Sequence, residues 1–167
     1  SNPRIKPLQQ TSSDILGLLY KEIPPKIYVK NRARKIQDKY VCIATESTAG
    51  AKYWLRENGW QDIIDYLNSI GYKVVLTQKE PNKFKNVIDM TGDRPIQDAI
   101  NLIYNCEFFI GLASGLAWIA WILKKKVIMI AGFTEEFTEF HENHYRVMNK
   151  NVCHGCWNDP KAYPFDK

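Results

Sequence analysis

A short run of small and hydroxyl-bearing residues could bind a phosphate group in the first third of the chain. Ser47 and Thr48 offer two hydroxyls, and Lys52 adds a cation to the same run. The run follows the apolar segment Val41–Ala44, and its small side chains leave the backbone N–H groups unshielded. Small residues after a strand are often only turn residues, and Lys52 could equally be an ordinary surface lysine. Alone, this loop is weak evidence for phosphate binding.

A second loop of the same kind lies in the second half of the chain. The apolar segment Glu107–Ile110 stops at Gly111, and Ser114 and Gly115 then open a strongly apolar helix. The N-terminal amides and the dipole of such a helix favour an anion. Two loops of this type in one α/β domain predict a ligand that carries a diphosphate.

Two cysteines near the C-terminal end have the spacing of a metal-binding knuckle. Cys153 and Cys156 enclose a His-Gly pair in a polar loop, which lets two thiolates chelate one metal ion. A redox Cys-x-x-Cys would instead follow the first strand of a thioredoxin-like unit. A metal needs about four ligands, and His154 and His144 are the uncertain further candidates. The sequence thus shows half a metal site, with a metal-free surface knuckle as the alternative.

The composition is that of one folded domain. The chain has 167 residues, 45% of them hydrophobic, which is enough to bury a core. The charge of +5 is modest and accompanies no RNA-binding or helix-turn-helix motif, so we expect no nucleic-acid partner. We find neither the roughly 18 apolar residues of a membrane span nor the apolar core of a signal peptide. We therefore expect a cytoplasmic protein in which Cys42 and Cys106 are reduced and buried.

Apolar segments typical of strands alternate with segments typical of helices. Gly71 stops the first helix, and Pro95 is allowed in the first turn of the second. The third helix is apolar on every side, which predicts that it is buried. We expect strands at 26–29, 40–45, 72–77, 86–89, 108–110, 127–130 and 145–148, and helices at 60–70, 95–105 and 114–123.

Strands that are apolar on both faces and alternate with helices predict an α/β fold with a Rossmann-like, doubly wound parallel sheet. Tyr40–Thr45 and Phe108–Ile110 should be adjacent at its centre. Ligands of such sheets bind beyond the carboxyl ends of the strands, where both small-residue loops would lie. We divide the chain into an extended lead-in with at most one helical turn (1–25), a ligand-binding domain (26–150) and a tail with the incomplete knuckle (151–167).

These segments resemble the C-terminal half of the ADP-heptose-dependent heptosyltransferases, and more closely the bacterial autotransporter O-heptosyltransferases, which modify serines of autotransporter adhesins. The family motifs are Thr91-Gly92, Phe108–Gly111, Ser114-Gly115, Val127–Ile130 and Gly132–Thr134. The subfamily motifs are Tyr40–Lys52, Gly59-Trp60, Gly71–Val74, Gly111–Trp118, and Thr138–Phe140 through Cys153–Asp159. The resemblance covers roughly residues 26–166. It implies the nucleotide-sugar-binding half of a GT-B glycosyltransferase.

The resemblance also implies roles for single residues. Ser47 and Thr48 would hydrogen-bond the donor diphosphate. Lys52 would neutralise the charge that grows on the ADP leaving group, with no metal on the diphosphate. Glu80 would hold the ribose hydroxyls. Amides for the phosphates or the heptose would come from Ser114, Gly115, Leu116 and Ala117.

One departure from the wider family concerns the donor sugar. Lipopolysaccharide heptosyltransferases have Asp-Thr-Gly and then a histidine in the second loop, where this chain has Ala113, Ser114, Gly115 and Trp118. The acid that would grip the heptose hydroxyls is missing, so the resemblance identifies the nucleotide better than the sugar. Trp118 is expected in the core, as is Trp121.

The resemblance further implies parts that this chain does not carry. In the family, further cysteines complete a four-thiolate iron-type centre, of which Cys153 and Cys156 would be half; zinc is the other candidate metal. The catalytic base belongs to the N-terminal half, so we expect no catalytic residue here and no turnover by this segment alone. We also expect a homo-oligomer.

Three functions follow, from different classes. The first is the donor-binding domain of an O-heptosyltransferase, with ADP-heptose and a serine-rich autotransporter adhesin as partners. The second is a sugar-nucleotide-binding module without turnover. The third is a metal-knuckle interaction domain on a Rossmann-like scaffold.

Overall fold

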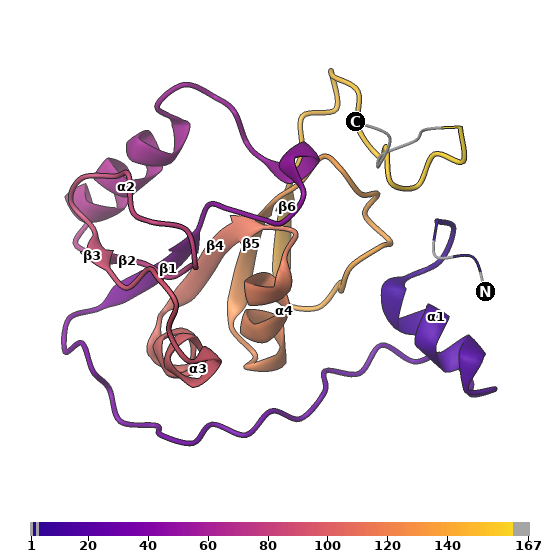
Figure 1. Ribbon diagram of the computed structural model, residues 1–167, viewed down its shortest axis with the longest axis horizontal. Helices are drawn as coiled ribbons and strands as arrows, with labels where there is room; N and C mark the ends of the chain where they lie inside the picture. The colour runs from indigo at the N-terminus through magenta and orange to yellow at the C-terminus, as the bar shows by residue number, and fades with distance from the viewer. Residues whose placement is uncertain (1, 3, 162–167) are drawn as a thin grey trace.

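A parallel sheet with helices on both faces forms the body of the computed structural model, which describes residues 2 and 4–161 (Figure 1). The six strands found in these residues run in the order β3-β2-β1-β4-β5-β6, and every pairing is parallel. The strands are β1 (Tyr40–Ala44), β2 (Lys73–Leu76), β3 (Ile88–Asp89), β4 (Phe108–Leu112), β5 (Lys126–Ile130) and β6 (His144–Val147). The helices are α1 (Leu8–Ile15), the 3-10 turn η1 (Gly50–Lys52), α2 (Gly59–Ser69), α3 (Ile96–Asn105) and α4 (Gly115–Ile122).

The predicted doubly wound sheet is confirmed, and so is its centre. β1 pairs directly with β4, with Ala44 opposite Gly111 at the carboxyl end. The strand order reverses at this junction, because β2 and β3 lie on one side of β1 while β5 and β6 lie beyond β4. Open α/β sheets bind ligands at such a reversal.

Two apolar layers enclose the sheet. α3 and α4 pack on one face with Cys42 and Trp121 in their cluster, and α2 packs on the other with Ile43 (Figure 1). All five residues of β1 are buried, as a central strand with both faces covered requires. Cys42 and Cys106 are 0% and 2% exposed, which confirms their assignment to the core.

Two predictions about the helices, the stop after α2 and the burial of the tryptophans of α4, agree with the structure. After α2, Gly71 adopts a φ of +92° and its N–H donates to the Asn68 carbonyl, while the Tyr72 N–H donates to that of Leu67. This Schellman pattern explains why a glycine stops the helix. In α4, Trp121 is 1% exposed and Trp118 is half-buried against the same core, as predicted.

Gly111 lets the two central strands approach each other closely. A β-carbon at this position would lie 2.9 Å from the backbone oxygen of Ala44 and 2.7 Å from the Phe109 ring. A backbone atom cannot swing away as a flexible side chain can, so only glycine fits. This glycine within β4 therefore lets the two strands that lead into the predicted phosphate loops lie close together.

The N-terminal part differs from the expectation in two places. The predicted lead-in contains a two-turn helix, α1, whose first N–H donates to the Thr138 carbonyl at 3.0 Å. Residues 26–29, expected as an edge strand, join no sheet in the described part of the chain. Asn101 of α3 instead holds the following segment through hydrogen bonds to the carbonyls of Asn31 and Ala33.

Two further expectations concern the ends of the chain and membranes. Residues 1 and 3 of the predicted lead-in, and residues 162–167 of the predicted tail, lie outside the described residues. Among the described helices, none combines the length and apolar character needed to cross a bilayer.

Candidate functional site

A cavity of about 350 Å³ lies where the carboxyl ends of β1, β2 and β4 meet the start of α4. The cavity contains most of the residues predicted to bind the ligand. Those that line it are Ser47, Thr48, Lys52, Glu80, Ser114, Gly115 and Leu116. Residues that are far apart in the sequence are thus brought together by the β1–β4 junction.

Ala117 is the exception among the predicted site residues. It is 0% exposed and belongs to the core cluster beneath α4. Its N–H donates to the Ser114 carbonyl at 3.1 Å, so this amide is already used inside the helix start. The helical periodicity explains the difference, because Ala117 turns inward where Ser114 and Gly115 face the cavity.

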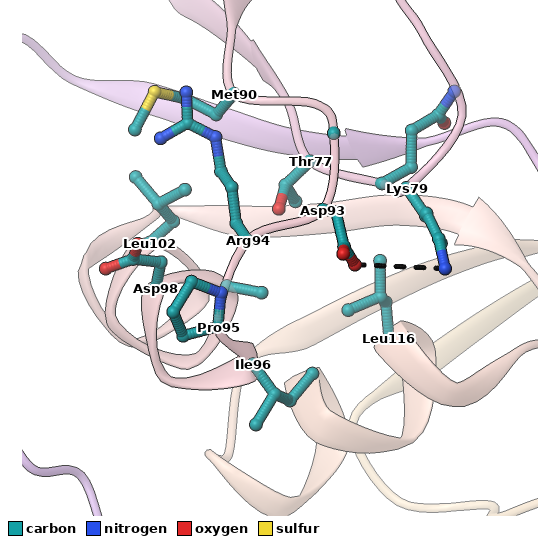
Figure 2. Close-up of a pocket in the computed structure, with 13 residues that line it drawn as sticks. Thr77, Lys79, Met90, Asp93, Arg94, Pro95, Ile96, Asp98, Leu102 and Leu116 are labelled. Carbon is teal, nitrogen blue, oxygen red and sulfur yellow. Dashed lines mark ion pairs between the residues drawn. The ribbon is translucent and has the colours of Figure 1, made fainter.

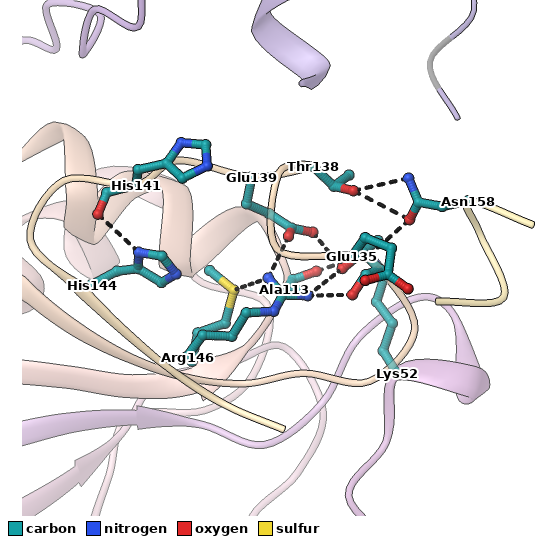
Figure 3. Close-up of polar contacts among 11 residues, drawn as sticks. Lys52, Ala113, Glu135, Thr138, Glu139, His141, His144, Arg146 and Asn158 are labelled. Carbon is teal, nitrogen blue, oxygen red and sulfur yellow. Dashed lines mark hydrogen bonds and ion pairs between the residues drawn. The ribbon is translucent and has the colours of Figure 1, made fainter. Parts of the chain in front are cut away.

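Lys52 links the two predicted phosphate loops (Figure 3). It ends the turn η1 after β1, and its Nζ donates to the carbonyl of Ala113 in the β4 loop at 2.8 Å. Nζ also lies 5.9 Å from the centre of the Phe133 ring. Burial lowers the pKa of Lys52, while the nearby Glu139 carboxylate opposes this and favours the charged form. A cation is therefore held between the two loops at the cavity wall.

Gln78 fixes the first loop against β2, and sequence reasoning did not identify it. Its side-chain oxygen accepts hydrogen bonds from the Thr45 N–H at 2.8 Å and the Thr45 hydroxyl at 3.1 Å. Both residues are buried, and Gln78 also lines the cavity. In the sequence, the position of Gln78 directly after a predicted strand was the signal that could have identified it as a site residue.

The start of α4 presents to the cavity amides that have no acceptor within the helix. The first N–H groups of a helix have no intrahelical acceptor, which applies here to Gly115 and Leu116. Within the described residues, the Ser114 hydroxyl makes no capping hydrogen bond. This hydroxyl and these amides could therefore meet an anion, as the helix dipole favours.

A second cavity, of about 250 Å³, adjoins the first on the side of α3 (Figure 2). It shares Gln78, Lys79, Ile96 and Leu116 with the first cavity. Its other lining residues are Thr77, Met90, Gly92, Asp93, Arg94, Pro95, Asp98, Ala99 and Leu102. The mixture of apolar side chains with a few charged groups at the rim suits a flat heterocycle with polar edges.

Sequence reasoning missed this second cavity, although two of its shaping signals were visible. Gly92 has a φ of +102°, and Asp89 accepts hydrogen bonds from the N–H and the hydroxyl of Thr91. This turn leads into Pro95, which directly precedes α3. Sequence analysis noted Gly92 within a family motif and Pro95 as a first-turn residue of a helix, but the cavity depends on how β2, α3 and α4 pack.

The Cys-x-x-Cys knuckle lies in a separate loop. The sulfur atoms of Cys153 and Cys156 are 3.9 Å apart. In a tetrahedral thiolate site with metal–sulfur bonds of about 2.3 Å, sulfurs are about 3.8 Å apart, so the pair fits two corners. Within the described residues, no third Cys, His, Asp or Glu completes a metal-binding group. His154 instead lies 3.9 Å from Glu135, and His144 lies on β6.

Known proteins are similar to this chain over most of its length. Autotransporter heptosyltransferase Aah of Escherichia coli is 36% identical over 172 residues, which cover 98% of this chain and 43% of Aah. Autotransporter heptosyltransferase TibC of E. coli O78:H11 is 39% identical over 154 residues, covering 87% of this chain and 37% of TibC. Inactive autotransporter heptosyltransferase BimC of Burkholderia thailandensis is 29% identical over 97% of this chain and 40% of BimC. The chain thus spans about two fifths of these relatives.

A solved structure extends the similarity to three dimensions. The dodecameric, iron-containing heptosyltransferase TibC in complex with ADP-D-beta-D-heptose matches 95% of this chain and 43% of the TibC chain. The TM-score is 0.89 at 36% identity. Residues 10–163 also match the family model of glycosyltransferase family 9, the heptosyltransferases. The chain therefore belongs to glycosyltransferase family 9 and corresponds to the C-terminal half of its members.

Proposed function

We propose that this chain is the donor-binding half of an autotransporter O-heptosyltransferase and binds the ADP part of ADP-heptose. The observation that carries this proposal is that the two loops predicted to bind phosphate meet at the β1–β4 junction, beside a second, largely apolar cavity. This arrangement has room for a diphosphate in one cavity and a nucleoside in the other. The similarity to TibC, whose solved complex contains ADP-D-beta-D-heptose, supports the same ligand.

The diphosphate would lie between the two loops. Lys52 would supply the cation, Ser47 and Thr48 their hydroxyls, and the amides of Gly115 and Leu116 further hydrogen bonds. Glycosyl transfer leaves negative charge on the departing ADP. Donors fixed before the reaction stabilise that charge without reorganisation, and such stabilisation is usually the largest single contribution to catalysis.

The nucleoside would enter the neighbouring cavity. Met90, Pro95 and Leu116 provide apolar contacts for the base, and Gln78 and Lys79 connect this cavity to the phosphate site. Glu80 is exposed at the rim of the phosphate cavity, within its lining, where it could accept hydrogen bonds from ribose hydroxyls. The heptose would lie near Ser114, where Ala113 offers no carboxylate.

The acceptor and the catalytic base belong to the proposal for the whole enzyme. Relatives more than twice as long are named autotransporter heptosyltransferases, which supports a serine-rich autotransporter adhesin as the acceptor. An N-terminal half would contribute the base that deprotonates the acceptor serine. A cytoplasmic location and a homo-oligomer complete this proposal, the latter supported by the dodecameric state of TibC.

Cys153 and Cys156 would hold an iron or zinc ion as two of its four ligands. Their sulfur separation fits such a site, and TibC is described as iron-containing. An ion bound there would cross-link the C-terminal loop to the residues that complete the site. We assign it no role at the diphosphate.

A second candidate function is sugar-nucleotide binding without turnover. BimC, which is named an inactive autotransporter heptosyltransferase, aligns with 97% of this chain. A relative that aligns with almost all of this chain is therefore named as inactive. The two candidates share the ligand and differ only in whether the sugar is transferred.

Calorimetry with ADP tests the shared part of both candidates. We expect saturable binding of ADP and weaker binding of UDP, because the second cavity must recognise the base. Equal affinities, or no binding, would contradict the donor-site proposal. Addition of the N-terminal half of a homologous enzyme, followed by mass spectrometry of an adhesin substrate, separates transfer from binding alone.

A further inference from the structure

Three polar side chains on β6 and the segment before it form an almost completely buried cluster, and Figure 3 shows the contact between two of them, Arg146 and Glu139. The cavity of about 350 Å³ that Lys52 lines is called the donor cavity below. Arg146 of β6 donates from Nη1 to the Glu139 carboxylate at 2.7 Å, and the two side chains are 4% and 3% exposed. Arg146 Nη2 donates to both the backbone carbonyl and the hydroxyl of Thr134. The Thr134 hydroxyl donates to the second Glu139 oxygen at 2.8 Å. The cluster thus fixes the segment between β5 and β6.

This segment reaches Lys52 in two ways. Phe133, next to Thr134, is buried, and its ring lies 5.9 Å from the Lys52 Nζ. Glu139 is also the carboxylate that favours the charged form of Lys52 against the effect of burial. The first is a cation–π contact and the second is a charge–charge interaction, and both depend on where the cluster holds its segment.

Other charges around the donor cavity are engaged elsewhere or exposed. Glu46 pairs with Lys83 at 2.5 Å, and Lys79 lies 3.8 Å from Asp93. Glu80 is exposed to solvent, which screens its charge. Among the described residues, Glu139 is therefore the buried carboxylate that acts on Lys52.

Stability alone is a poor explanation for this ion pair. Apolar side chains of similar volume usually replace a buried ion pair at no loss of stability. Within the described residues, Arg146 Nε is buried and has no hydrogen-bond partner, which costs further free energy. The buried ion pair is thus an inefficient way to stabilise the fold. A requirement of the proposed donor site explains its presence better.

We propose that Arg146, Glu139 and Thr134 are positioning residues for Lys52, which they hold as a cation between Phe133 and the Ala113 carbonyl. The inference rests on the proposed function, in which Lys52 faces the donor diphosphate. None of the three lines the donor cavity, so they act through Lys52 and not on the ligand.

The test replaces the whole ion pair by apolar side chains, Glu139→Leu together with Arg146→Met. We expect the paired variant to fold and to bind ADP about tenfold more weakly than the wild type. In that background Lys52→Ala should weaken binding by less than about twofold, because Lys52 no longer occupies its position. An unchanged ADP affinity of the paired variant, or the full effect of Lys52→Ala in it, would overturn the proposal.

The control is another ion pair of the same chain, which is only partly buried. Lys6 and Asp14 pair at 2.6 Å in the N-terminal part, outside both cavities. Lys6→Met together with Asp14→Leu should leave ADP affinity unchanged. A tenfold loss in this control as well would attribute the effect to general destabilisation and overturn the positioning role.

A second measurement needs no ligand. Glu139→Gln keeps the volume and most hydrogen bonds but removes the charge, and lysine side-chain NMR follows the titration of Lys52. We expect Lys52 to lose its proton at a lower pH in this variant, and an unshifted titration would overturn the positioning role. Failure of the wild type to bind ADP would overturn the proposed function instead, so the two failures are distinguishable.

Discussion

The donor cavity and the Cys-x-x-Cys knuckle are both candidate ligand sites, but the fold builds them differently. The cavity receives side chains from the loops after β1, β2 and β4 and from the starts of α3 and α4. The knuckle comes from one loop and contributes two thiols. A site assembled by sheet register is complete as soon as the sheet forms. A metal site that begins with two ligands close together in the sequence stays incomplete until other residues supply the remaining ligands.

The strongest test of this difference targets the junction that creates the cavity. Gly111→Ala would place a β-carbon 2.9 Å from the Ala44 carbonyl oxygen. We expect the free energy of unfolding to fall by about 3 kcal/mol, because a packed backbone cannot yield. Chemical denaturation measures this loss, and ADP binding should weaken with it.

Gly132→Ala is the matched control for this substitution. Gly132 follows β5 as Gly111 lies in β4, but nothing lies within 4 Å of a β-carbon placed there. We expect a change of less than about 0.5 kcal/mol. Equal losses in both variants would show that the close approach of β1 and β4 does not limit the residue at position 111.

The next effect concerns the cation within the cavity. Lys52→Ala should weaken ADP binding by about 1.5–3 kcal/mol, the scale of a charge-assisted hydrogen bond, while the chain stays folded. Calorimetry measures the change, with the exposed Lys21→Ala as control. An ADP affinity equal to that of the control variant would remove Lys52 from the donor site.

The charge of Lys52 also makes ADP binding depend on pH. Burial lowers its pKa from the ordinary 10.5, so the cation is lost in the folded chain before it is lost in the unfolded chain. ADP affinity should therefore fall as the pH rises through the lowered pKa. The contribution of Lys52 to stability has the opposite sign, because the unfolded state binds more protons between the lowered pKa and 10.5, and stability rises there.

Titration of ADP affinity from neutral pH up to 10.5, the ordinary pKa of a lysine, checks this expectation. Lys52→Ala should abolish most of the pH dependence in that range. A wild-type affinity that stays constant up to the ordinary pKa of lysine would mean that the Lys52 cation does not contact the diphosphate.

Much of the fold followed from periodicity in the sequence. Apolar residues on both faces of Tyr40–Ala44 require a central parallel strand, and Gly71 ends α2 by its positive φ. The secondary-structure predictions that were wrong concern segments that lack such periodicity. Residues 26–29 have the composition of a strand, but the hydrogen bonds of Asn101 hold the chain that follows them against α3. α1 has no buried residue, so its sequence carries no apolar stripe from which the length of the helix could be predicted.

The donor site was predictable as far as local chemistry reveals it. The hydroxyls of Ser47 and Thr48 and the amine of Lys52 stood out in the sequence because their types suit phosphate. Gln78 and the α3 side of the second cavity did not, since their role depends on packing between distant segments. The inward turn of Ala117 depends on where α4 begins, which sequence patterns give only within a residue or two.

For the Cys-x-x-Cys knuckle, in contrast to the donor cavity, the prediction concerns an incomplete site and its metal content. Two thiols cannot satisfy a tetrahedral ion, so we expect the purified chain to hold less than one tightly bound iron or zinc ion per monomer. Elemental analysis after gel filtration measures the content. One retained ion in a monomer would mean that a histidine such as His154 or His144 completes the ligand shell.

The smallest expected effect is that of the knuckle on the donor cavity. Neither cysteine lines the donor cavity or its α3-side neighbour, and their loop follows β6 at the edge of the sheet. Both cysteines share a separate cavity of about 690 Å³ with Lys52, but neither lines the two cavities proposed for ADP. Cys153→Ser together with Cys156→Ser should therefore change ADP affinity by less than about 0.5 kcal/mol, because these small substitutions remove no contact proposed for ADP. Metal content or assembly should change far more. If ADP affinity fell as much as in Lys52→Ala, the two sites would be coupled, and the view that sheet register alone completes the donor cavity would be wrong.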